Sequence, residues 1–181
     1  MLARDIWRIR DVRKTCDESP FHLCLATLTN YSFSSSGDRP IMPQESIRKP
    51  RQIIDRKALK AELEELVVWS GYTPKTQDKV LEIYKCAYRA GWDEVRRRFE
   101  DAEAGGPETT HAHAYLMDQV VRLIHEFALS SVYPAANPTT GEQMAVIATG
   151  GYGRCELAPF SDIDLMFLLP YKLTPHSEQV V

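Results

Sequence analysis

The sequence predicts an α+β protein in which helices precede a small strand-containing region. Two observations lead to this expectation. Between about residues 55 and 133, apolar residues recur every three or four positions, which is the period of an amphipathic helix. Two apolar runs of strand length, MAVIAT and IDLMFLL, then flank a glycine-containing turn close to the end of the chain. We therefore expect helices first and a short sheet after them.

Residues 1–50 show neither the helical nor the strand periodicity of apolar residues. They mix charges with a Ser-rich tract, SFSSSGDRP, and several prolines, so we predict a disordered leader. An internal start at Met42 would remove most of this leader and begin the chain just before the first patterned helix. We therefore expect translation to start at Met42, which N-terminal sequencing of the native product would test.

Three amphipathic helices are predicted in the next region. The first follows Asp55, whose side chain can cap RKALKAELEELVVWS, and it ends at Gly71. The second begins at about Thr76, and Gly91 could interrupt it. The third occupies about residues 110–133, where apolar residues again repeat at three and four. A further short helix could open after Thr174 or Pro175, beyond the strands.

A glycine pair stands between the two expected strands. Gly150 and Gly151 directly follow the first strand, where glycines permit a sharp turn and close approach of the backbone to a ligand. A helix that starts there would present unpaired amides and the positive end of its dipole to an anion, most often phosphate. Taken alone, the pair is a weak signal, and a tight turn with no ligand is the favoured interpretation.

Asp162 and Asp164 stand at the start of the second expected strand. Side chains two residues apart in a strand project from the same face, so both carboxylates can reach one point while Ile163 faces the core. Two carboxylates this close repel each other, and a divalent cation removes that cost. Mg²⁺ prefers oxygen ligands and keeps positions for phosphate. Together with the glycine turn, the pair indicates nucleotidyl transfer; a solvated strand end is the alternative.

Composition and charge disfavour several other classes of function. A net charge of −3 and a pI near 6.0 give no overall attraction for nucleic acid or anionic membranes, and we expect neither as a partner. The four cysteines are scattered without a C-x-x-C pair, which disfavours a zinc ribbon and fits a reducing cytoplasm. No apolar stretch approaches the roughly 20 residues of a membrane span.

The segment GGYGRCELAPFSDIDLMFLLPYK is characteristic of one protein family. It resembles the DNA polymerase beta-type nucleotidyltransferase superfamily, and most closely the N-terminal catalytic domain of the bacterial protein-PII uridylyltransferase/uridylyl-removing enzymes. The close resemblance covers about residues 144–181, and residues 53–133 resemble that family's lead-in more loosely. The family's members transfer UMP from UTP to a tyrosine of the nitrogen-regulatory PII protein, so the resemblance implies UTP, PII and Mg²⁺ as ligands and partners.

The resemblance also implies roles for individual residues. Gly150 and Gly151 would approach the triphosphate, Asp162 and Asp164 would hold Mg²⁺, and Ser161 would sit beside the metal. The remaining implied contacts are weaker: Arg154 could touch phosphate or form a surface ion pair, and Tyr152 is expected to pack rather than to react.

Two departures from the family pattern stand out. Cys155 replaces a glycine, which would strain the backbone if the position has positive φ. The superfamily's third carboxylate comes from a later strand, and the chain ends before one can form. We therefore expect a disordered leader over 1–50, indicated by composition alone, and, as the resemblance implies, a helical lead-in over 51–134 and the first half of a polymerase beta-like domain over 141–181, incomplete at the C-terminus. We expect such a fragment to be inactive alone.

Two other functions are kept open. The chain could belong to another nucleotidyltransferase, of adenylyl or aminoglycoside type, or it could be a non-catalytic module that binds a protein through its helices. The other polar groups point to no site: His111 and His113 lie on different sides of a helix, His125 fits a helix surface or core, and Arg96–Arg98 between Glu94 and Glu100 fit an ion-paired helix face.

Overall fold

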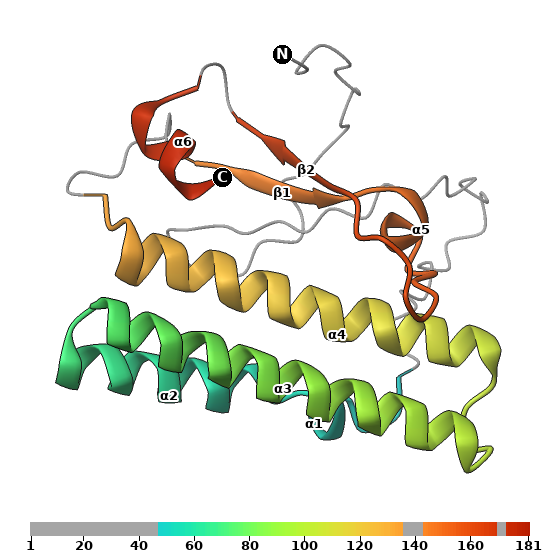
Figure 1. The fold of residues 1–181 in the computed structure, drawn as a ribbon. Coiled ribbons are helices and arrows are strands. Elements are labelled where there is room, and N and C mark those ends of the chain that lie inside the picture. The colour runs from blue at the N-terminus through green and yellow to red at the C-terminus, as the bar shows by residue number, and fades with distance from the viewer. Residues whose placement is uncertain (1–46, 136–142, 170–172) are drawn as a thin grey trace, which may run out of the picture.

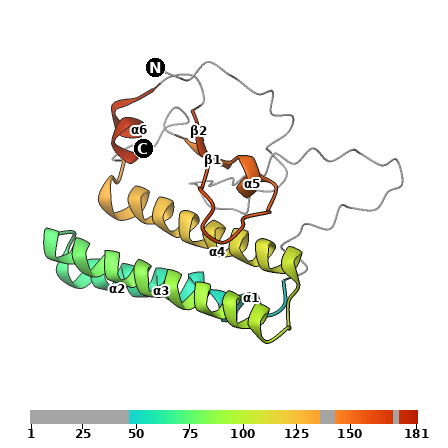
Figure 2. The same ribbon diagram turned by 45° about the vertical axis from the view of Figure 1, so that its right-hand side comes forward.

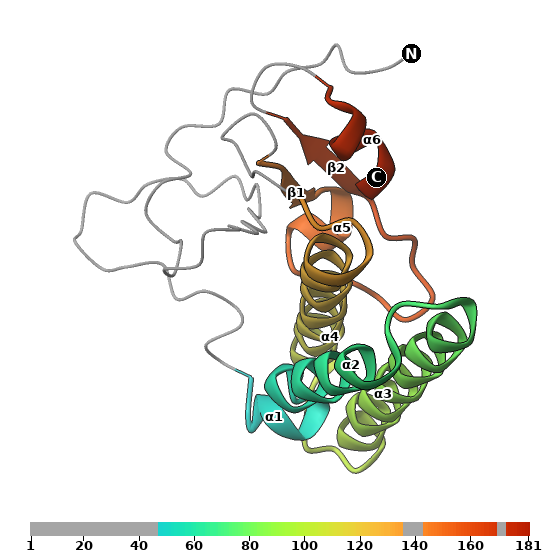
Figure 3. The ribbon, with the colours of Figure 1, turned by 90° about the vertical axis from the view of Figure 1, so that its left-hand side faces the viewer.

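The computed structural model describes residues 47–135, 143–169 and 173–181. Helix α4 (Gly106–Phe127) lies in the middle, with α2 (Arg56–Ser70) and α3 (Pro74–Glu100) on one side and a two-stranded sheet on the other (Figures 1 and 3). Turning the molecule keeps this order of layers (Figure 2). The described part is thus mostly helical with a small sheet, which agrees with the α+β prediction. None of its helices is long and apolar enough to span a membrane.

The ends of α2 follow local signals in the sequence. The Asp55 side chain accepts a hydrogen bond from the backbone N–H of Ala58 at 3.2 Å, which caps the first turn. Gly71, with φ of 64°, ends the helix, as glycine does where the chain must enter the left-handed region. Both predicted ends of this helix are confirmed.

Helix α3 starts slightly earlier than expected and runs through Gly91 without interruption. Thr73 caps it and Pro74 occupies its first turn. The interruption considered at Gly91 is therefore wrong. An ideal Cβ at Gly91 would lie 2.5 Å from Cδ1 of Leu116 and 2.7 Å from the carbonyl oxygen of Ile53. The glycine lets α4 and the short helix α1 (Pro50–Ile53) come close to α3.

Helix α4 contributes to the core on two sides. Toward α2 and α3, Leu123 and Phe127 pack with Leu63 and Val80. Toward the sheet, Ala114 of α4 packs in a cluster with four residues of β1 and the segment that follows it, Ala148, Tyr152, Cys155 and Leu157. A π-helical turn, Ala128–Val132, follows α4, so the helical path extends to about the predicted end of the third helix.

Strand β1 (Ala145–Ala148) pairs antiparallel with β2 (Leu165–Leu168), with Ala145 opposite Leu168 and Ala148 opposite Leu165. Val146, Ile147 and Ala148 are almost completely buried, whereas β2 is half-buried to exposed. Both strands fall inside the apolar runs that predicted them. Helix α6 (Pro175–Val180) follows, and Thr174 caps it by accepting from the Ser177 N–H at 3.2 Å.

Residues 47–49 attach to α3 through Arg98. The Arg98 guanidinium is buried, pairs with Glu94 at 2.8 Å and donates to the carbonyl oxygens of Arg48 and Lys49. Its neighbours Arg96 and Arg97 are exposed and paired with carboxylates, as expected for an ion-paired helix face. Residues 1–46, with Met42, lie outside the described residues, so the leader and the internal start stay predictions.

Candidate functional site

The glycine turn leaves β1 through a single helical turn, α5 (Gly150–Gly153). This helix is much shorter than the one expected after the glycine pair, because Cys155 has φ of 60° and takes the chain out of the helical region. Gly150 also has positive φ, at 60°. Gly153, which the sequence argument did not single out, is equally constrained: an ideal Cβ there would lie 2.5 Å from the carbonyl oxygen of Ala148.

The turn and the aspartate segment meet at Asp164. The Thr149 backbone N–H donates to the Asp164 carbonyl oxygen at 2.9 Å, which extends the pairing of β1 and β2 by one residue. The Asp164 carboxylate lies beside the α-carbon of Gly150, where a Cβ would be 2.5 Å from Oδ2. Two residues that are far apart in the motif, and that the sequence assigned to one site, are therefore in contact.

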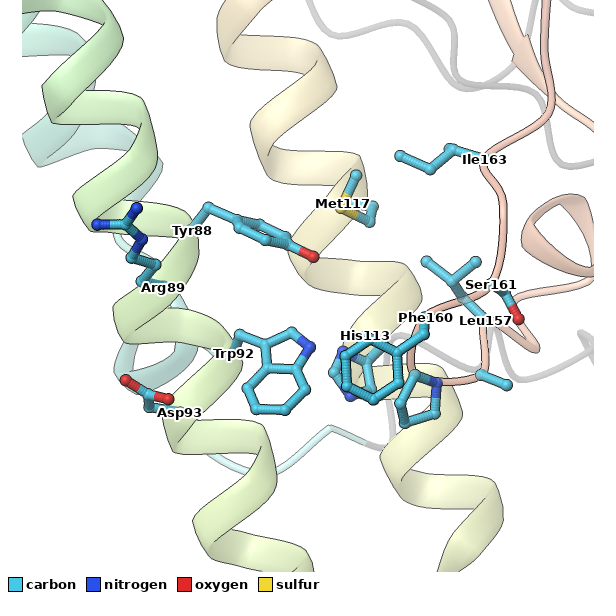
Figure 4. Close-up of a pocket in the computed structure, with 12 residues that line it drawn as sticks. Tyr88, Arg89, Trp92, Asp93, His113, Met117, Leu157, Phe160, Ser161 and Ile163 are labelled. Atoms are coloured by element: carbon cyan, nitrogen blue, oxygen red, sulfur yellow. The ribbon is translucent and has the colours of Figure 1, made fainter.

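Asp162 and Asp164 precede β2 rather than start it, and both are exposed. Ile163, between them, points into a pocket formed with α3 and α4 (Figure 4). Alternate side chains of an extended backbone face opposite sides, which is the basis for predicting that the two aspartates share one side. Ser161 lies directly before Asp162, and its N–H closes a turn on the Ala158 carbonyl oxygen at 3.1 Å.

Arg154 lies at the end of α5 and makes local contacts. Its Nε pairs with the Glu156 carboxylate at 3.0 Å, and a terminal guanidinium nitrogen donates to the Gly150 carbonyl oxygen at 3.0 Å. Both partners of the ion pair are exposed. The surface ion pair considered from the sequence is present, while a phosphate contact of Arg154 stays a prediction.

Tyr152 connects the turn to helix α4. Its ring is buried, and its hydroxyl donates to Oδ1 of the buried Asp118 at 2.8 Å. Burial, and then the adjacent Asp118 carboxylate, raise the pKa of Tyr152 far above its usual range, so the phenol stays protonated. The expectation that Tyr152 packs is confirmed. Asp118 was missed, and its signal is a lone carboxylate inside the apolar repeat LMDQVV.

A pocket of about 530 Å³ lies between α3, α4 and residues 157–163 (Figure 4). Its walls are mainly aromatic and apolar, from Tyr88, Trp92, His113, Met117, Leu157 and Phe160. His113 is buried there, and burial lowers its pKa. His111, on another side of α4, is less buried.

The candidate metal ligands of the site are the carboxylates of Asp162 and Asp164. Across the described ranges, no group of three or more His, Cys, Asp or Glu side chains is placed to hold a metal ion. The donor set at the candidate site is the pair of exposed carboxylates, Asp162 and Asp164, with the Ser161 hydroxyl next in the chain. These are oxygen donors, the kind that Mg²⁺ prefers.

Comparison with known proteins identifies a family and several relatives of the chain. The family model described as glutamate-ammonia ligase adenylyltransferase matches residues 40–179. Curated relatives named bifunctional uridylyltransferase/uridylyl-removing enzyme are 49% identical over 135 residues in Rhodospirillum rubrum, 46% over 136 in Azospirillum brasilense and 41% over 139 in Erythrobacter litoralis. These matches cover 75–77% of the chain but only 14–15% of the relatives' lengths.

No solved structure matched the chain. The family model and the relatives carry different nucleotides in their names, adenylyl in one and uridylyl in the others. They agree on nucleotidyl transfer, which is also what the glycine turn and the aspartate pair indicated. The chain therefore belongs to the nucleotidyltransferase family that the glutamate-ammonia ligase adenylyltransferase model describes, and its curated relatives are the bifunctional uridylyltransferase/uridylyl-removing enzymes.

Proposed function

We propose that the chain supplies the first half of the nucleotidyltransferase site of a longer enzyme that transfers UMP from UTP to a tyrosine of the PII signalling protein. One observation carries the proposal: the Asp164 carboxylate lies against Gly150, so the turn suited to phosphate and the carboxylates suited to a cation adjoin. The identity to uridylyltransferases supports UTP, and the short coverage of those relatives supports a longer parent.

Gly150 and Gly151 contribute to nucleotide binding because they have no side chains. Without side chains, the backbone at the start of α5 can come close to the triphosphate, and the positive φ of Gly150 turns the chain there at no steric cost. Arg154 lies one turn later with an exposed guanidinium, so it can exchange its Glu156 partner for a phosphate oxygen. The turn thus binds and orients the nucleotide.

Asp162 and Asp164 would hold Mg²⁺, with Ser161 beside them. When bound, the ion supplies charge neutralisation at the α-phosphate and at the departing pyrophosphate. The protein's own contribution is to fix the backbone at Asp164 through the Thr149 N–H, which donates to the Asp164 carbonyl oxygen at 2.9 Å. A third carboxylate is expected from residues of the parent beyond Val181, so we propose that the chain alone is inactive or nearly so.

Adenylyl transfer is the second candidate, because the matching family model is named for an adenylyltransferase. Isothermal titration of a longer product of the same gene with UTP, ATP, CTP and GTP in the presence of Mg²⁺ distinguishes the two. Preferred binding of UTP, followed by UMP transfer to PII, supports the proposal. Preferred binding of ATP, with no modification of PII by UTP, would replace it with the adenylyl alternative.

A further inference from the structure

The segment that carries Ser161 and Asp162 begins with a tight turn over residues 158–161. The Ser161 N–H donates to the Ala158 carbonyl oxygen at 3.1 Å, Pro159 is the second residue, and Phe160 is the third, with φ of 66°. Proline second and positive φ third is the pattern of a type II turn, which normally has glycine or asparagine at the third position. Phe160 is a strained choice there.

Burial of the ring does not explain this choice. Phe160 is 91% exposed, more than any other large hydrophobic residue in the described part of the chain. A glycine would form the same turn without strain, and little apolar surface would be lost. Neither the turn conformation nor burial in the core therefore explains a phenylalanine at position 160.

The ring of Phe160 lies beside the ring of Trp92 on α3. The ring centroids are 5.7 Å apart and the planes are tilted by 51°. Trp92 is itself held, because it packs on the core formed by α1, α3 and α4 and lies 5.9 Å from the ring of His113. Figure 4 shows the three rings grouped between the helices and the 157–163 segment. Phe160 thus connects the turn to a fixed point on the helical layer.

The flanks of the segment are held in other ways. Leu157 is buried against the sheet-facing side of α4, and Asp164 is fixed by Thr149 and Gly150. Between them, the side chains of Ser161 and Asp162 form no hydrogen bond or ion pair with any described residue. The placement of Asp162 therefore depends on the turn and on the contact that the turn makes with α3.

We propose that Phe160 is a positioning residue: through its ring on Trp92, it fixes the Ser161–Asp162 half of the metal-binding segment, while Gly150 and Thr149 fix the Asp164 half. The proposal rests on the proposed function, because it assigns the purpose of the contact to the aspartate pair. It explains why a strained and exposed aromatic residue directly precedes Ser161-Asp162.

The test uses the 181-residue chain and four variants. Phe160→Gly removes the ring and relieves the backbone, Phe160→Ala removes the ring but keeps a Cβ, Trp92→Leu removes the partner, and Phe160→Tyr keeps the aromatic contact as a matched control. Three quantities are measured: the denaturation midpoint, the ¹⁵N relaxation order parameters of the Ser161 and Asp162 amides, and Mn²⁺ affinity by electron paramagnetic resonance with UTP present.

We expect Phe160→Gly to be at least as stable as the wild type and yet to lose order at Ser161 and Asp162. Their order parameters should fall from about 0.85 toward 0.6 in Phe160→Gly, Phe160→Ala and Trp92→Leu, and stay unchanged in Phe160→Tyr. Mn²⁺ should bind about tenfold more weakly in the three disrupted variants, the loss typical of removing support from a metal ligand. A purely structural role would instead lower the midpoint and leave the order parameters alone.

The proposal is overturned if the order parameters of Ser161 and Asp162 are unchanged in Phe160→Ala and in a folded Trp92→Leu, regardless of the Mn²⁺ affinity. If Trp92→Leu does not fold, Phe160→Ala against Phe160→Tyr decides. The proposed function is tested separately in a longer product of the gene: if Asp162→Asn and Asp164→Asn both bind Mn²⁺ there as the wild type does, the aspartates are not the metal ligands, and the order parameters of the 181-residue chain still report whether Phe160 anchors the turn.

Discussion

The Asp164 carboxylate occupies the space that a side chain at Gly150 would need, since an ideal Cβ on Gly150 would lie 2.5 Å from Asp164 Oδ2. Gly150 also has φ of 60°, a conformation that L side chains rarely adopt. The backbone conformation therefore favours glycine at this position, and a side chain there would displace the Asp164 carboxylate. The glycine turn and the aspartate segment depend on each other.

Gly150→Ala should destabilise the chain by about 1–3 kcal/mol, because it combines strain at positive φ with displacement of the Asp164 carboxylate. Gly151→Ala is the matched control: its Cβ would lie 3.3 Å from the Glu156 carbonyl oxygen, and its φ is not positive. Urea denaturation measures both. Equal midpoints for the two variants would show that the contact with Asp164 does not constrain position 150.

Asp162→Asn and Asp164→Asn should each abolish nucleotidyl transfer in a longer product of the gene while preserving the fold, because each removes a charge from the cation site and keeps the side-chain shape. Transfer of labelled UMP to PII at saturating Mg²⁺ is the assay, and circular dichroism checks folding. A variant that retains more than about a tenth of the wild-type rate would exclude the metal-ligand role for its residue.

Cys155→Gly should make the chain at least as stable as the wild type. The φ of 60° at Cys155 favours glycine, whereas loss of the buried thiol costs some apolar burial. Cys155→Ala keeps the strain and loses the thiol, so it separates the two effects. We expect the glycine variant to exceed the alanine variant by about 1 kcal/mol in chemical denaturation. A lower midpoint for glycine than for alanine would mean that position 155 is not strained.

Tyr152→Phe should cost about 1–3 kcal/mol of unfolding free energy, because it removes a donor from the buried Asp118 carboxylate and leaves the packing of the ring intact. Tyr88→Phe, at an exposed tyrosine on α3 with no hydrogen bond to a described residue, is the control and should cost far less. Thermal and urea unfolding of the two variants measure the difference. Similar losses in both would rule out a special contribution from the link to Asp118.

Stability should fall as the pH drops below about 6.5, the usual pKa of histidine. Burial lowers the pKa of both His113 and His125 in the folded state, while Glu126 opposes this at His125. As the pH falls, these histidines therefore bind protons in the unfolded chain before they do so in the folded chain, and this lowers the free energy of unfolding. The loss continues until the pH reaches the lowered pKa of the folded state. Above pH 6.5 the histidines are neutral in both states, so they cause no pH dependence. Urea midpoints from pH 8 to 5 measure it. His125→Leu should flatten the profile; an unchanged slope would exclude His125 as a cause.

Local signals in the sequence located most of the helices and strands. Asp55 and Gly71 bounded α2 because capping and termination depend on neighbouring backbone groups alone. Gly91 was misjudged because its role is tertiary: it makes room for Leu116, which is distant in the sequence. Helix α5 came out short because Cys155 takes a backbone conformation that its residue type does not indicate.

In the candidate site, too, some features could be predicted from local sequence and others depend on tertiary contacts. The motif fixed the spacing of Gly150 and Asp164, and their contact follows from the antiparallel return of the chain. Asp118 could not be assigned, because a single carboxylate in an apolar repeat does not name its partner. The contact of Trp92 with Phe160 joins segments from two structural layers, and no period or motif in either segment indicates it.

The attachment of residues 48 and 49 to Arg98 bears on where the chain can be shortened. The two carbonyl oxygens belong to the backbone, so substituting Arg48 or Lys49 would leave them in place, whereas a protein starting at Pro50 would lack both. A buried guanidinium would then keep mainly Glu94 as its acceptor, a costly state for a desolvated charge. For expression or fusion, the usable N-terminal boundary of the helical layer therefore lies at or before Arg48, upstream of its first helix.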